Sequence, residues 1–278
     1  MTSLYVRTGV LAFAVLLFVM VFGSGAGVSK NDAPYLAADH TILPIVWGDT
    51  GIELVHTGVI DPVKWRALYG TSLTAEEETL LSGTSTDKLV MTKENASYLL
   101  NLFWAVGLAN KNQILEDKKG MMNPAYGGAD HFASTGGWTL STGSPMDHYD
   151  HHLLFALTSN QQKLVEKVSA GIYRPCCDNP TSFPDCNHGM AMLGLLEMMA
   201  SQGATEQQMW KAALAVNEYW FPDTYKTIAV YMKHKGISWA DVNPQEVLGA
   251  QYSSASGYAK IAAQVTQPKQ QSAGSCGV

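Results

Sequence analysis

The chain has 278 residues, of which 46% are hydrophobic, and its formal net charge at pH 7 is −6. A mildly acidic protein offers no positive surface for phosphate backbones, so composition argues against nucleic acid as a partner. It contains no basic amphipathic stretch that would hold it on an anionic membrane surface. This length can bury a sizeable core and lies near the upper limit of a single domain, so we expect one folded domain.

The N-terminus has the features of an export signal. Arg7 precedes an apolar run from Val10 to Phe22, which small residues then follow. The run is shorter than the ~20 residues of a membrane-spanning helix, and Ser24 and Ala26 form an A-x-A-like cleavage site. We therefore expect residues 1–26 to be a cleaved signal peptide of a periplasmic or extracellular protein. The alternative is an uncleaved N-terminal membrane anchor, which is the only membrane contact that the sequence suggests.

Two short apolar runs between Leu36 and Ile60 flank a turn at Gly48 to Gly51 and are compatible with a small hairpin. From Asp61 onward, capping residues, proline at the first helical position and closing glycines predict helices. The expected helices cover about residues 61–70, 74–83, 92–108, 159–173, 186–203, 205–221, 222–236, 244–251 and 258–265. The predicted fold is all-α, a single-domain helical bundle over residues 27–264 with long irregular loops and that N-terminal hairpin.

The segment from Met190 to Ala200 is expected at the centre of the bundle. Glu197 is its only charged residue, and its neighbours are apolar. A helix that is hydrophobic on most sides is buried on most sides.

A long loop without periodicity, from Lys118 to Pro145, leads into three closely spaced histidines. On a helix, His148 would lie one turn from both His151 and His152, an arrangement that could hold zinc or copper. The simpler interpretation is a polar helix start at which Asp147 is the cap and the histidines are solvated.

Three of the four cysteines lie in one short stretch. Cys176 and Cys177 occupy a proline-rich loop, and Cys186 and His188 stand where Pro184 and Asp185 predict the start of a helix. Thiolates are soft ligands and imidazole is a borderline one, and both suit copper or zinc. Their spacing is not a common zinc-finger spacing, and no CxxC occurs, so the pattern alone does not name a family.

The same cysteines have two other interpretations. In an oxidising compartment they can form structural disulfides, and Cys276 in the tail of residues 265–278 would then pair with Cys176 or Cys177. A bond between the adjacent Cys176 and Cys177 would be strained. Alternatively, Cys186 at a helix N-terminus has a lowered pKa and acts as a redox nucleophile that Cys176 or Cys177 resolves.

From the sequence we predict an exported envelope protein that binds copper or zinc. The alternatives are a disulfide-stapled structural or interaction module of the envelope and a thiol redox protein that uses Cys186. The expected partners are the metal ion or a small envelope protein. No GxSxG or HExxH motif supports a hydrolase. The predicted ligands are Cys176, Cys177, Cys186 and His188, with His148, His151 and His152 as further candidates.

Overall fold

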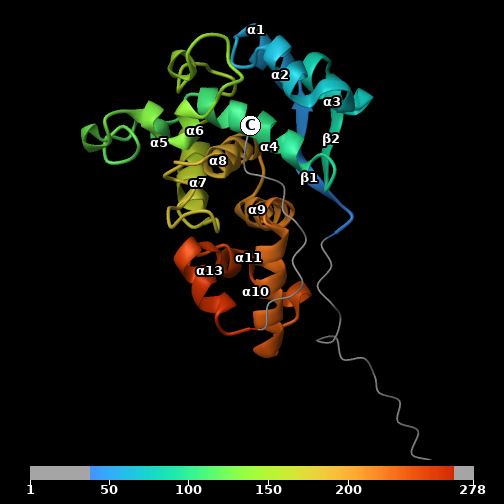
Figure 1. The fold of residues 1–278 in the computed structure, drawn as a ribbon, viewed down its shortest axis with the longest axis vertical. Helices are drawn as coiled ribbons and strands as arrows, with labels where there is room; N and C mark the ends of the chain where they lie inside the picture. Colours follow the sequence, from blue (N-terminus) through green and yellow to red (C-terminus); the bar gives the residue numbers. More distant parts are fainter. Residues whose placement is uncertain (1–37, 266–278) are drawn as a thin grey trace, which may run out of the picture. The chain divides into compact units, whose positions relative to one another are not determined.

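Most of the described chain is helical, and one small antiparallel sheet lies among the helices (Figure 1). The computed structural model describes residues 38–265, which all belong to one compact unit. The predicted signal peptide and the tail that carries Cys276 lie outside the described residues. Within residues 38–265, none of the helices has both the length and the apolar character needed to cross a membrane.

The sheet makes the prediction of an all-α fold wrong. Strand β1 (His40–Gly48) pairs with β2 (Ser85–Thr92) in antiparallel register, so the protein is mixed α/β although mostly helical. Leu43, Ile45 and Trp47 alternate along β1 and are at most 1% exposed. This period of two places one face of the strand in the core. The sequence pattern predicted no strand at residues 85–92 and a helix from Thr92, where β2 in fact ends.

The predicted local hairpin does not form, because the second apolar run is helical. Helix α1 (Thr50–His56) follows β1 directly, and α2 (Pro62–Tyr69) and α3 (Ala75–Ser82) come before β2. A Cβ atom on Gly51 would lie 1.9 Å from the Leu80 carbonyl oxygen, so α1 and α3 touch through their backbones. This packing outweighs the local β-propensity of residues 52–60, as tertiary context often does.

Helices α4 (Ala96–Ala109) and α8 (Asn187–Ser201) form the centre of the molecule. A Cβ on Gly107 would lie 2.0 Å from the Met190 carbonyl oxygen, and one on Gly194 would lie 2.3 Å from that of Phe103. The two backbones therefore meet without intervening side chains. Residues from Met190 to Ala200 are buried throughout, which confirms the predicted central position of this segment.

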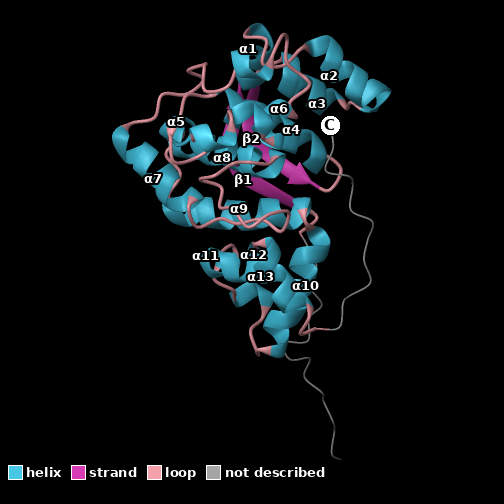
Figure 2. Ribbon diagram, turned by 60° about the vertical axis from the view of Figure 1, so that its left-hand side comes forward, coloured by secondary structure: helices cyan, strands magenta, loops and turns pink. Residues whose placement is uncertain are grey.

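The remaining helices surround this pair or follow it. They are α5 (Gln113–Glu116), α6 (Ala133–Gly136), α7 (Ser159–Ser169), α9 (Glu206–Trp220), α10 (Pro222–His234), α11 (Pro244–Val247), α12 (Ala250–Ser253) and α13 (Ala255–Ala262). Helices α6, α7 and α9 contact α8, and α10 contacts α13. Figures 1 and 2 show α10 to α13 grouped together, with α9 between that group and α8.

Gly107→Ala should lower the free energy of unfolding by about 2 kcal/mol, because overpacking of a tight contact costs ~1–3 kcal/mol. In an exposed helix the same change would stabilise the protein by ~1 kcal/mol. Urea denaturation followed by circular dichroism measures the difference. Ser97→Ala, at an exposed position of the same helix, is the control and should change little. A stabilised Gly107→Ala variant would contradict the close contact of α4 and α8.

The single carboxyl group on α8 is fully buried. Glu197 accepts hydrogen bonds from the side-chain amides of Asn110, at 3.1 Å, and Asn112, at 2.6 Å. Burial raises the pKa of Glu197 well above its usual value, although these two hydrogen bonds oppose the shift.

This raised pKa predicts a pH dependence of stability. Above pH 4.5, the ordinary pKa of the group, the folded state holds a proton that the unfolded state releases. The free energy of unfolding should then fall as pH rises, by up to ~1.4 kcal/mol per pH unit until the folded-state pKa is reached. Glu197→Gln should remove this slope, whereas Glu53→Gln at an exposed site should keep it. Urea denaturation between pH 4.5 and 8 tests this, and a slope unchanged in Glu197→Gln contradicts it.

Candidate metal centre

A buried arginine organises the loop that carries the cysteines. Arg174 is 1% exposed, and its guanidinium donates to the carbonyl oxygens of Asn179, at 3.0 Å, and Phe183, at 3.2 Å. It also donates to the Asp185 carboxylate at 2.5 Å and, through Nε, to the Cys186 sulfur at 2.9 Å. A buried cation is tolerated only when it is paired and hydrogen-bonded, and here one side chain gathers four acceptors from the loop.

Hydrogen bonds between residues close in sequence also hold this loop in place. The amide N–H of Phe183 donates to the Pro180 carbonyl at 2.9 Å, and the Asn179 side-chain amide donates to Asp185 at 2.8 Å. The amide of Ala255, at the start of α13, donates to the Cys177 carbonyl at 2.9 Å. A contact from α13, distant in the sequence, therefore also fixes the backbone at Cys177.

Helix α8 begins at this loop, with Cys186 as its N-cap. The N–H of Met190 donates to the Cys186 carbonyl at 3.0 Å, which closes the first turn. A Cβ on Gly189 would lie 2.5 Å from Arg174, so the absence of a side chain there lets the guanidinium lie against the helix. The predicted helix start at Cys186 is confirmed.

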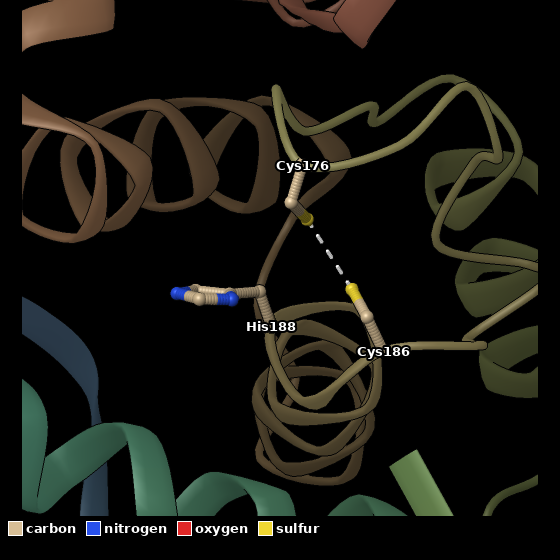
Figure 3. Close-up of side chains that lie close together, drawn as sticks. All are labelled: Cys176, Cys186 and His188. Carbon is tan, nitrogen blue, oxygen red and sulfur yellow. Dashed lines mark hydrogen bonds between the residues drawn. The ribbon is translucent and has the colours of Figure 1, made fainter. Parts of the chain in front are cut away.

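The sulfur atoms of Cys176 and Cys186 point toward each other and are 3.4 Å apart (Figure 3). His188 stands on the first turn of α8 beside them, and its ring is turned to one side. Cys176, Cys177 and Cys186 are free thiols, Cys176 being exposed and the other two partly buried. The structure therefore brings a thiol of the loop close to a thiol and an imidazole at the start of the helix.

Two overlapping groups of side chains could hold a metal ion. One consists of Cys176, Cys186 and His188, and the other of Cys177, Asp185 and Cys186. Within each group the ligand atoms lie within 4.8 Å of one another. Cys186 belongs to both groups and is the common point of the site.

The three thiols differ in their electrostatic environment. Contacts with Cys176 and Cys177, assisted by His188 and by the Arg174 charge, hold the pKa of Cys186 well below its usual value despite burial. The hydrogen bonds with Cys177 and Cys186 raise the pKa of Cys176. The Cys176 contact lowers the pKa of Cys177, but the Cys186 contact and burial outweigh it and raise the value to about 11. Cys186 is therefore the most readily deprotonated of the three thiols.

His188 carries an unused buried nitrogen. The residue is 4% exposed, its ring lies 4.4 Å from that of Phe221 between centroids, and the Trp220 ring packs edge-on at 5.7 Å. Its Nδ1 atom has no hydrogen-bond partner within residues 38–265. Buried polar atoms almost always have a partner, so an unsatisfied one needs an explanation such as an ion.

The three remaining candidate histidines, His148, His151 and His152, do not lie on the expected helix. A single 3-10 turn, Pro145–Asp147, is followed by turns, and Asp150 has a φ of 54°. His148 Nδ1 lies 3.1 Å from His152 Nε2, and its Nε2 lies 2.8 Å from the Thr142 carbonyl oxygen. His151 is exposed.

This histidine pair lies at the other end of α8 from the cysteines. The backbone of His152 forms an isolated β-bridge with Asn110, and the side chain of Asn110 donates a hydrogen bond to Glu197. Glu197 is nine residues beyond His188, which is ~13 Å along a helix. The structure therefore does not bring His148, His151 and His152 into the cysteine site.

The sequence analysis missed Arg174 as a member of the site and used Asp185 only as a sign of a helix start. A cation immediately before the Pro-Cys-Cys run was the available signal, because a positive charge stabilises a thiolate. The chain matches no protein-family model, no curated protein and no solved structure. We therefore infer function from the geometry of the site.

Proposed function

We propose that this protein binds one Cu(I) ion through Cys176, Cys186 and His188. The observation that carries the proposal is the convergence of two thiol sulfurs and one imidazole nitrogen within 4.8 Å of one another. The unsatisfied Nδ1 of His188 supports it, since a rotation of this ring would exchange a buried unpaired atom for a metal ligand.

The number and type of these ligands favour Cu(I) over Zn(II). Thiolate is a soft ligand, and Cu(I) accepts three soft ligands without a fourth. Structural zinc is almost always four-coordinate, so zinc would need Cys177 or a water molecule to complete the set. Zinc is the second candidate for this reason.

The group that contains Cys177 is less suited to a soft ion. Both carboxylate oxygens of Asp185 are already used, one by Arg174 and the other by Asn179. The Cys177 thiol is directed to the Asn179 carbonyl, at 3.8 Å, and to Asp185, at 3.7 Å. We therefore assign Cys177 to the surroundings of the metal and not to its ligands.

Arg174 has a positioning role in this proposal. Its N–H group fixes the Cys186 sulfur, and its charge offsets one of the two thiolates that the metal requires. Hydrogen bonds and charges that surround the metal ligands orient those ligands and tune the affinity for the metal. Because bound thiols lose their protons, Cu(I) affinity should fall as pH falls.

The biological role we propose is to hold or transfer copper outside the cytoplasm. The N-terminal sequence supports export, and a small envelope protein is the expected partner for transfer. The disulfide-stapled module remains the competing interpretation, and it predicts protein without free thiols or stoichiometric copper.

Titration of reduced protein with Cu(I) against a chromophoric chelator tests the proposal. We expect one ion per chain, and a loss of affinity of at least ~10-fold, or ~1.4 kcal/mol, in Cys176→Ser, Cys186→Ser and His188→Ala. Cys177→Ser and His131→Ala are the matched controls and should bind as the wild type does.

Circular dichroism of each variant verifies that it is folded, so a loss of binding reports on the site. Wild-type affinity in Cys186→Ser would overturn the proposal. If each chain instead holds one Zn(II) ion that Cu(I) does not displace, the proposed metal is zinc and not copper. The assignment of the ligands then stands.

A further inference from the structure

We propose that Cys176 and Cys186 also carry out thiol–disulfide exchange with small-molecule disulfides, and that the bond they form closes the metal site. The exchange activity stands on the geometry of the two sulfurs alone. Only its consequence, the release of copper, rests on the proposed function.

The two sulfurs are already close to bonding distance. Their separation is 3.4 Å, and a disulfide needs ~2.05 Å, so an approach of ~1.4 Å suffices. Cys186 is fixed at the start of α8, whereas Cys176 is exposed on a loop. The loop residue can therefore move to the helix residue while the helix keeps its place.

Geometry selects this pair among the three described thiols. A bond between Cys176 and Cys177 would join adjacent residues, which strains the disulfide torsion. The Cys177 thiol is directed to Asn179 and Asp185. Cys176 and Cys186 are the two sulfurs that point at each other (Figure 3).

The reaction has two balanced steps. Cys186, whose sulfur accepts the Arg174 Nε–H at 2.9 Å, attacks a small disulfide RSSR as the thiolate, an S–S bond forms between Cys186 and one RS group, and the other RS group leaves and takes up the proton as RSH. Cys176 then attacks the Cys186 sulfur, gives up its own thiol proton, and releases the second RSH. The pair loses two electrons, RSSR gains them, and excess RSH reverses both steps.

The surroundings suit both states of the pair. In the oxidised state Arg174 would keep its bonds to Asn179, Phe183 and Asp185, so the buried cation would not be left without acceptors. The metal would lose both thiolates at once, and His188 alone would not retain it. One local bond thus separates a copper-binding state from a closed state.

The test uses full-length, metal-free, reduced protein equilibrated in buffers with increasing ratios of oxidised to reduced glutathione. Thiol counting and peptide mapping after cleavage before Asp178 and Asp185 show whether Cys186 is linked to the peptide that carries Cys176 and Cys177, and fragmentation of that linked peptide in the mass spectrometer identifies which of the two is bonded. We expect Cys176 and Cys186 to be lost together and linked in the wild type, and equally in Cys177→Ser and Cys276→Ser. Cys176→Ser and Cys186→Ser should give mixed disulfides with glutathione or no reaction, without an internal link at this site.

Oxidised protein should then show at least a ~100-fold lower Cu(I) affinity, which excess reduced glutathione followed by its removal restores. A link from Cys186 to Cys177 or Cys276, or loss of the link in Cys276→Ser, would overturn the exchange proposal. If the expected link forms but reduced protein binds no Cu(I), the proposed function fails and the exchange stands. If reduced protein binds Cu(I) but no link forms, the exchange fails alone.

Discussion

The buried guanidinium of Arg174 is the constraint on which the site depends. It binds two carbonyl groups, one carboxylate and one sulfur, and these acceptors span the loop from Asn179 to Cys186. Removing one partner of a buried ionic group is costly because the other is left uncompensated. The cation therefore fixes the loop against the first turn of α8 and determines where the thiols lie. Gly189 makes this possible, since a side chain there would occupy the position of the guanidinium.

The glycine-mediated contact between α4 and α8 supplies the rigid element under the site. Gly107 and Gly194 let the two backbones touch, so the start of α8 is anchored by its own buried length. A site needs such support, because ligands held on rigid elements keep their geometry better than ligands held on loops alone. The centre combines both kinds: Cys186 and His188 belong to the helix, whereas Cys176 belongs to the loop and can move.

The sequence predicts what is local and misses what is distant. Pro184 and Asp185 predicted the helix that begins at Cys186. The apolar residues around Glu197 predicted that this helix is buried. The partner of β1 lies more than thirty residues further along the chain, and no local pattern reveals which segment will pair with a strand. The role of Arg174 was likewise invisible, since only folding brings its four acceptors together. The histidine cluster does not form a helix, because the chain turns after Asp147 and Asp150 has a φ of 54°, a left-handed conformation that an α-helix does not contain.

The most direct test of the central claim is X-ray absorption at the copper edge on protein loaded with one Cu(I) ion. We expect the copper ion to be coordinated by two sulfur atoms and one imidazole nitrogen. His188→Ala should lose the imidazole scattering and keep the sulfur, and Cys177→Ser should leave the spectrum unchanged. A shell of three sulfurs without imidazole, or one of nitrogen and oxygen only, would contradict the assignment of Cys176, Cys186 and His188.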